Sequence, residues 1–77
     1  MSILNKVLGT NIRERRKELG MSQDMLAKLA GYKDRSSITK LEKGETDIVL
    51  TRVVAIANAL ETTAEQLMVK SNNQQIS

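Results

Sequence analysis

Residues 20–44 read GMSQDMLAKLAGYKDRSSITKLEKG, and this stretch decides the fold. It contains Gly20, Gly31 and Gly44, and a glycine after an apolar helical run is a typical helix end because it adopts a positive φ without strain. Ser22 and Asp34 follow the first two glycines closely, and short polar side chains of this kind cap helix N-termini. The pattern predicts two short helices, over residues 22–30 and 35–43, joined by a tight turn.

Helical periodicity continues on both sides of this stretch. Apolar residues spaced by three or four positions predict further helices over residues 3–19, 49–60 and 64–69. The last of these opens with a capping box formed by Thr63 and Gln66. We therefore expect an all-α fold, a compact five-helix bundle over residues 1–69, followed by a polar, disordered tail over residues 70–77. The residues expected in its core are Leu8, Ile12, Leu19, Leu26, Ala27, Ile38, Leu41, Val53, Ile56, Leu60 and Leu67.

Composition excludes several classes of protein. The chain has 77 residues, 40% of them hydrophobic, and contains neither cysteine nor histidine. Disulfides and thiolate zinc sites are therefore excluded, and the side chains most used as nucleophile and general base near neutral pH are missing. The sequence also lacks a glycine-rich phosphate loop and any apolar run near the roughly 20 residues of a membrane span. We expect no enzymatic activity, no cofactor, no metal site, no small-molecule ligand, no membrane association and a cytoplasmic location.

Positive charge is concentrated in one part of the chain. The formal net charge is +3, which by itself is unremarkable for a soluble protein. Residues 28–43, however, hold five basic residues against two acidic ones, so the net charge of this window alone equals the +3 of the whole chain. A basic segment that covers a predicted helix with few apolar positions favours contact with a nucleic-acid backbone.

The glycine-bounded stretch and its surroundings resemble the Cro and phage-repressor helix-turn-helix family. The resemblance covers about residues 8–68. It rests on the pattern from Arg16 to Gly31, on Ser37 to Gly44, and on Ile56 to Leu60 followed by Thr63 and Leu67. One departure is an additional residue in the turn near Tyr32 and Lys33. The resemblance implies a lambda-repressor-like DNA-binding domain and a sequence-specific transcriptional regulator, a repressor of phage or prophage type encoded by a bacterium or phage.

The resemblance also implies which residues meet DNA. The recognition helix, residues 35–43, is expected to lie in the major groove of double-stranded DNA with its N-terminal side chains at base edges. Its base-reading positions fall on Arg35, Ser36 and Lys40, with Thr39 as a further candidate, either through a backbone contact or through its methyl group. The Arg35 guanidinium suits guanine O6 and N7 together, whereas Lys40 suits either guanine or a phosphate.

Other residues of the motif are expected to contact the DNA backbone or to hold the fold. Gln23, Ser37 and Lys43 are expected backbone contacts, and Lys33 either contributes diffuse attraction to phosphate or lies in solvent. The resemblance pairs Arg16 with Glu42 in a partly buried salt bridge that connects the first helix to the third.

A single module of this size reads only a few base pairs, and members of the family usually bind pseudo-palindromes as dimers. We therefore expect a homodimer on a pseudo-palindromic operator. Its interface is expected to involve Glu61, Thr62, Ala64, Met68 and Val69. Met68 and Val69 equally suit a role in closing the core.

Two other functions fit the same fold. One is an antitoxin, which would bind DNA and also a toxin protein. The other is a protein-interaction module that has lost DNA binding. The basic, polar third helix argues against the interaction module, because such a surface is expected to expose an apolar stripe.

Overall fold

The computed structural model describes residues 3–69, and within that range the chain forms five α-helices and no strand. They are α1 (Ile3–Glu18), α2 (Gln23–Ala30), α3 (Arg35–Glu42), α4 (Leu50–Ala59) and α5 (Ala64–Met68). The all-α fold expected from the sequence is confirmed. The expected tail lies outside the described residues. Within the described range, no helix is long and apolar enough to cross a membrane.

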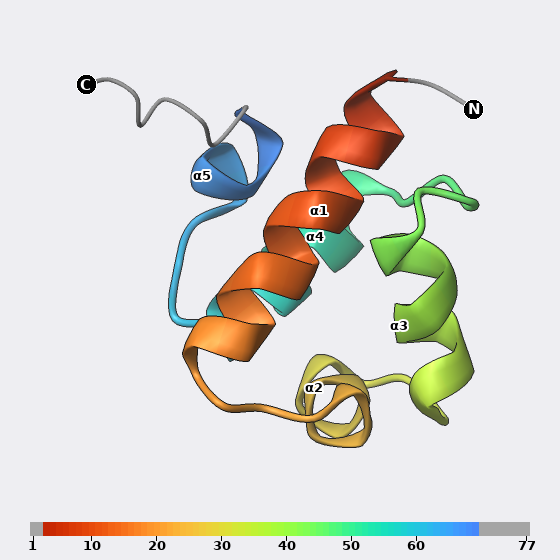
Figure 1. The fold of residues 1–77 in the computed structure, drawn as a ribbon, viewed down its shortest axis with the longest axis vertical. Coiled ribbons are helices and arrows are strands. Elements are labelled where there is room, and N and C mark those ends of the chain that lie inside the picture. The colour runs from red at the N-terminus through yellow and green to blue at the C-terminus, as the bar shows by residue number, and fades with distance from the viewer. Residues whose placement is uncertain (1–2, 70–77) are drawn as a thin grey trace.

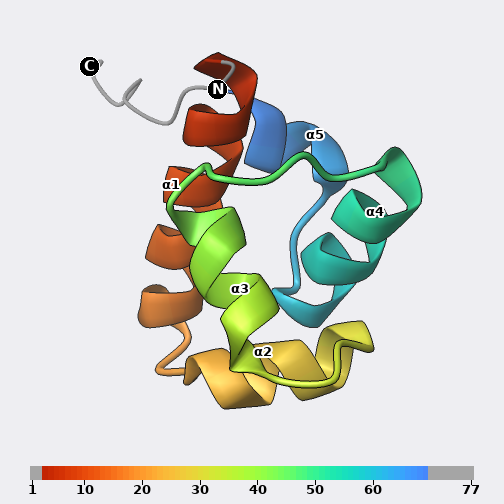
Figure 2. The same ribbon diagram turned by 90° about the vertical axis from the view of Figure 1, so that its right-hand side faces the viewer.

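The helices pack around one core, with α1 running along the length of the molecule (Figure 1). α1 contacts α3 and α5, whereas α2 contacts α3 and α4. In Figure 2, α2 lies across one end of the molecule, and α3 stands on it with its outer face toward the viewer. α3 is therefore supported by α1 and α2 and leaves one long face in solvent.

Local signals in the sequence define the helix ends. Ser22, Asp34 and Thr63 each accept a hydrogen bond from a backbone N–H two or three positions later, at 3.0, 2.9 and 3.1 Å respectively. Such caps satisfy backbone donors that have no partner inside the helix. At the other end of α2, Gly31 adopts a left-handed conformation with φ of 85°. A glycine takes this conformation without the steric cost of a Cβ.

The core is aliphatic and contains residues from every helix. Leu19, which was expected in the core, is only partly buried and packs against it from the turn after α1. Two small residues that the core prediction did not include, Ala30 and Ala57, are buried. The other core residues are Leu8, Ile12, Leu26, Ala27, Ile38, Leu41, Val53, Ile56, Leu60 and Leu67.

Several large apolar residues of the helices are exposed. Ile3 and Leu4 are 81% and 51% exposed, because the first turn of α1 lies at the end of the molecule (Figure 1). Leu29, Leu50 and Val54 are also exposed, although their helices bury other apolar residues. Short helices that carry apolar residues around most of their circumference bury only the side that meets a neighbour.

Long-range contacts to backbone atoms fix the outer helices on α1. The buried Asn11 donates through Nδ2 to the backbone oxygens of Leu67 and Val69, both at 2.7 Å. Arg15 donates through Nε to the Leu60 backbone oxygen at 2.9 Å, at the C-terminus of α4. These side chains satisfy carbonyl groups that a helix end leaves without an intrahelical partner.

Candidate nucleic-acid interface

The exposed face of α3 brings together most of the predicted reading residues. Successive residues of an α-helix are about 100° apart, so Ile38 and Leu41 define one side, residues 36, 39, 40 and 43 lie toward the opposite side, and residue 35 lies at the edge between them. Ile38 and Leu41 are buried, whereas Arg35, Ser36 and Lys40 are exposed. α3 therefore presents cations and hydroxyl groups together on its solvent face.

Asp34 organises the start of this face. One oxygen of its carboxylate, Oδ1, accepts the backbone N–H of Ser36 at 2.9 Å and also the hydroxyl proton of Ser36. The bond from the hydroxyl, followed by the bond from the backbone N–H, lowers the pKa of the Asp34 carboxyl below its ordinary value of 3.8. Asp34 is therefore ionised at neutral pH and acts only as an acceptor.

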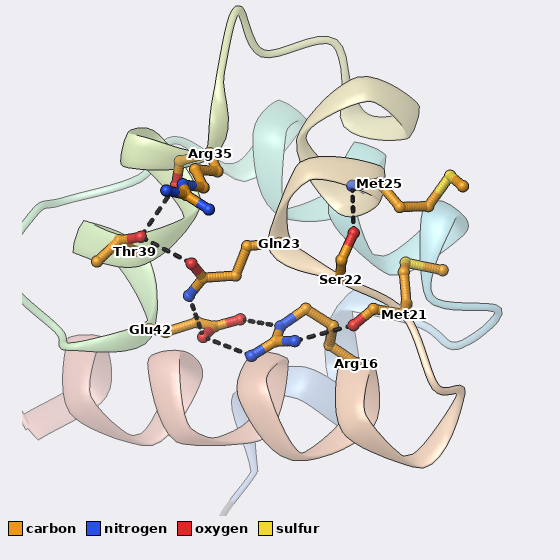
Figure 3. Close-up of polar contacts among 8 residues, drawn as sticks. All are labelled: Arg16, Met21, Ser22, Gln23, Met25, Arg35, Thr39 and Glu42. Atoms are coloured by element: carbon orange, nitrogen blue, oxygen red, sulfur yellow. Dashed lines mark hydrogen bonds and ion pairs between the residues drawn. The ribbon is translucent and has the colours of Figure 1, made fainter.

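A buried ion pair fixes α3 against α1. The Arg16 Nε lies 2.6 Å from Glu42 Oε2, and the side chains are only 12% and 3% exposed. Arg16 also donates through Nη2 to Glu42 Oε1 at 3.2 Å and through Nη1 to the Met21 backbone oxygen at 2.9 Å (Figure 3). One guanidinium thus connects α1, the turn before α2 and the last residue of α3.

The same carboxylate orients the side chain at the start of α2. Gln23 donates through Nε2 to Glu42 Oε1 at 2.9 Å, and its Oε1 lies 2.9 Å from the Thr39 hydroxyl (Figure 3). An ionised carboxylate cannot donate, so the amide nitrogen of Gln23 must face Glu42 and its oxygen must face Thr39. The Thr39 hydroxyl is then the donor. A network from Arg16 to Thr39 therefore joins α1, α2 and α3 behind the exposed face of α3.

An open recess of about 330 Å³ lies beside this network. Its lining includes Gln23 from α2, Lys43 from the end of α3, and Thr10 and Arg13 from α1. Thr39 and Glu42, whose carboxylate is paired with Arg16, complete the lining. Hydroxyl, amide and cationic groups thus surround one recess next to the recognition helix, a set of donors that suits an anion.

Ser37 and Lys33 lie away from this recess. Ser37 is partly buried on the other flank of α3, in a recess that Lys40 and Tyr32 also line. Lys33 is exposed in the turn between α2 and α3, next to Lys28 and Asp34. The predicted backbone contacts therefore line three separate recesses around α3 rather than one row.

Arg52 from α4 holds the turn between α2 and α3. Its Nη1 donates to the Ala30 backbone oxygen at 3.2 Å, and its guanidinium lies 4.7 Å from the centre of the Tyr32 ring. Burial raises the pKa of the Tyr32 phenol above its ordinary value of 10.0, although the charge of Arg52 acts in the opposite direction. The turn in which the resemblance suggested an additional residue thus packs against α4.

The residues predicted for a dimer interface lie at and before α5. Ala64 and Met68 are partly buried and pack against the core, whereas Val69 is 50% exposed. Glu61 is exposed and adopts a positive φ of 58°, which is uncommon for a residue with a side chain. Of the five predicted residues, Ala64 and Met68 therefore help to close the core, Thr62 is partly buried, and Glu61 and Val69 offer exposed surface.

Sequence reasoning missed three residues that the structure places beside α3 or the turn before it. Arg13, Asp24 and Arg52 were not among the predicted site residues, although Arg13 lines the recess beside Gln23 and Arg52 holds the turn before α3. In the structure the Asp24 Oδ2 lies 4.0 Å from the Arg35 Nη1, with both side chains largely exposed. A helical wheel of α1 places Arg13 close to Arg16, and this was the available signal for the first of these residues.

Comparisons with known proteins agree with this geometry. Residues 12–67 match the model of a helix-turn-helix family. The chain is 28% identical to the control protein C.SmaI of Serratia marcescens over 67 residues, covering 87% of this chain and 79% of that protein.

Two solved structures have the same fold at higher identity. One is the restriction-modification controller protein C.AhdI from Aeromonas hydrophila, with a TM-score of 0.77 and 33% identity over 82% of this chain and 94% of that one. The other is the DNA-binding domain of the P22 C2 repressor, with a TM-score of 0.79 and 30% identity over 91% of this chain and 90% of that one. The chain therefore belongs to the helix-turn-helix family of Cro- and phage-repressor-type DNA-binding transcription regulators.

Proposed function

We propose that this regulator is a repressor that binds a pseudo-palindromic operator in double-stranded DNA as a homodimer, with α3 in the major groove. The observation that carries the proposal is the exposed face of α3, which presents Arg35, Ser36 and Lys40 while the buried pair of Arg16 and Glu42 holds the helix from behind. A rigid helix with donors on its open face is the element that reads base edges in this type of domain.

Within this proposal, Arg35, Ser36, Thr39 and Lys40 read bases. Arg35 is exposed at the first position of α3, where two nitrogens of its guanidinium suit guanine O6 and N7. Gln23, Ser37, Lys33 and Lys43 contact the backbone. Such contacts fix the position of the domain on DNA without specifying its sequence.

The recess beside Gln23 adds Arg13 to the backbone contacts. Arg13 and Lys43 line it from α1 and α3, and Gln23 keeps a second amide proton after its bond to Glu42. A phosphate there would meet two cations and an oriented amide donor. This arrangement supports a phosphate contact on the α1 side of the recognition helix.

Dimerisation is proposed because one module of this size reads too few base pairs for an operator. Glu61, Ala64, Met68 and Val69 are the proposed interface. The half-exposed Val69 supplies apolar surface next to the partly buried Met68. Each α3 would then read one half-site, with half-sites about one turn of DNA apart.

The proposed activity is binding without catalysis. The relatives described above are a controller protein, a control protein and a repressor domain, and all of them are named as regulators. We place the protein in the cytoplasm of a bacterium, because the proposed partner is bacterial or phage DNA.

The test is selection of bound duplexes from a random pool at two salt concentrations, followed by sequencing. An enriched pseudo-palindrome with strongly salt-dependent binding supports the proposal, because each phosphate contact releases counterions. Sedimentation of the protein with the enriched duplex must give two chains per duplex. If no sequence is enriched and the retention of DNA does not depend on salt, the protein-interaction function replaces this one. If a partner protein is found whose binding makes this chain release its DNA, the antitoxin function is favoured instead.

Arg13→Ala tests the recess with Lys28→Ala as a control of equal charge. Both changes remove one cation from an exposed helix position. Loss of a phosphate contact lowers affinity for all sequences and reduces the salt slope by about 1. We expect this for Arg13→Ala and a smaller change in slope for Lys28→Ala; equal slopes for the two variants would remove Arg13 from the backbone contacts.

A further inference from the structure

The hydroxyl group of Ser36 donates its proton to the Asp34 carboxylate at the exposed start of α3. We propose that Ser36 faces DNA only as a hydrogen-bond acceptor, and that Asp34 thereby determines which bases it selects. This inference rests on the proposed function, because it assigns base preference to a residue of the same reading face. It makes Asp34 a positioning residue for specificity in addition to the cap of α3.

The geometry at the start of α3 gives the direction of the bond. Asp34 Oδ1 accepts both the backbone N–H and the side-chain hydroxyl of Ser36. A serine hydroxyl carries one proton and two lone pairs, whereas an ionised carboxylate has no proton to donate. The proton of Ser36 is therefore committed to Asp34, and only its lone pairs remain for another partner.

The charge of Asp34 strengthens the same preference. Its pKa is lowered by the bonds from Ser36, so the carboxylate is negative at neutral pH. A negative charge beside the Ser36 oxygen attracts a donor on the base and repels an acceptor. The committed proton and the negative charge therefore both disfavour base edges that present an acceptor to Ser36.

The major groove offers few donors. Adenine presents its N6 amino group and cytosine its N4 amino group, whereas guanine presents only acceptors at O6 and N7, and thymine an acceptor and a methyl group. An acceptor-only Ser36 takes adenine or cytosine and disfavours guanine or thymine at the contacted base. A serine with a free proton would accept any of the four.

The Thr39 hydroxyl, one turn later along α3, also donates its proton to a group of the protein. This hydroxyl is 2.9 Å from Gln23 Oε1, and the orientation of Gln23, fixed by Glu42, requires Thr39 to donate. Its other close acceptor, at 3.1 Å, is the Arg35 backbone oxygen, which also belongs to the protein. The face of α3 therefore combines cationic donors with two hydroxyl groups whose protons are donated to other groups of the protein, Asp34 and Gln23.

The experiment compares sequences selected by the unmodified protein and by three variants. Ser36→Ala identifies the operator position that Ser36 reads, as the position that loses its preference. Asp34→Asn keeps an acceptor oxygen but removes the charge, whereas Asp34→Gly removes both and retains a residue tolerated at a helix N-terminus. The guanine position assigned to Arg35 must persist in every variant, and this shows that each one folds and binds.

We expect adenine or cytosine at the Ser36 position for the unmodified protein and for Asp34→Asn. For Asp34→Gly we expect guanine and thymine to become acceptable, with discrimination reduced by about 2- to 10-fold, the range of one hydrogen bond. The inference would be overturned if the base preference at the Ser36 position were unchanged in Asp34→Gly. It would also be overturned if Asp34→Asn relaxed this preference as much as Asp34→Gly. Absence of any enriched sequence for the unmodified protein would instead refute the proposed function itself.

A second measurement needs no variant. In the enriched duplex, the adenine or cytosine at the Ser36 position is replaced by the corresponding base without its amino group. We expect affinity to fall by about 2- to 10-fold. The same replacement at a position outside the operator is the control. Unchanged affinity at the Ser36 position would overturn the inference even if the selected sequence contained adenine or cytosine there.

Discussion

Replacing Glu42 with alanine tests the network that holds the recognition helix. The change removes the acceptor of three hydrogen bonds, two from Arg16 at 2.6 and 3.2 Å and one from Gln23 at 2.9 Å. Arg16 keeps only its bond to the Met21 backbone oxygen, at 2.9 Å. The variant therefore leaves a guanidinium that is largely out of water without its counter-charge.

The burial of the pair sets the magnitude. Removing one partner of a buried ion pair costs about 3–5 kcal/mol. The Arg16 side chain keeps 12% of its exposure, so water solvates it in part, and we expect the lower end, about 3 kcal/mol. A domain of this size has a total stability of roughly 4–12 kcal/mol, so the loss is a large fraction of it. The melting temperature should fall by on the order of 15 °C.

The assay is urea unfolding followed by circular dichroism, with the free energy of unfolding extrapolated to water. Glu18→Ala is the matched control, because Glu18 also pairs with an arginine of α1, at 3.2 Å, but its side chain is 66% exposed. An exposed pair contributes about 0–1 kcal/mol. The double variant Arg16→Met with Glu42→Leu removes both charges, and we expect it to recover most of the loss.

A stability of Glu42→Ala within about 0.5 kcal/mol of that of Glu18→Ala would refute this prediction, because the buried pair would then contribute no more than an exposed one. The prediction also fails if the double variant is as unstable as Glu42→Ala. In that case the loss would come from packing rather than from an unpaired charge.

Three further predictions concern DNA binding, packing and pH. Arg35→Ala should cost about 1–3 kcal/mol of affinity for the enriched duplex without changing the melting temperature; unchanged affinity by fluorescence anisotropy would remove Arg35 from the reading residues. Gly9→Ala should destabilise the fold by about 1–3 kcal/mol in urea, since its Cβ would lie 2.3 Å from the Leu41 backbone oxygen of α3; a fully stable variant contradicts this close approach. Tyr32 is the only tyrosine, so absorbance at alkaline pH reports its phenol alone. Because its folded pKa is raised above 10.0, its contribution to stability is present below that pH and is lost as pH rises through the folded pKa, and Tyr32→Phe should remove this loss.

Much of the candidate interface could be predicted from short patterns in the sequence. The exposed positions of α3 could be predicted because Ile38 and Leu41 are apolar and the helical period then assigns the remaining positions to the other faces. The pairing of Arg16 with Glu42 is different, since these residues are 26 positions apart. No periodic pattern connects them, and only the resemblance to a family pointed to the pair.

The recess containing Arg13 and the acid beside Arg35 were not predictable from single elements. Arg13 lies on α1 and lines a recess with residues of α2 and α3, so its role depends on how three helices pack. Asp24 approaches Arg35 only because α2 and α3 meet near their N-termini. Exposed charges carry no periodic signal that distinguishes a binding residue from a solvated one.

The sequence by itself determined where the helices end and which of their faces are apolar. The caps at Ser22, Asp34 and Thr63 join atoms only two or three residues apart, so they form in the same way wherever the helix packs. The tertiary structure alone decided the partners of Asn11 and Arg52, whose hydrogen bonds span 56 and 22 residues. The physical reason is that a local hydrogen bond is fixed by the backbone geometry of one turn, whereas a distant one exists only after the core has brought two helices together.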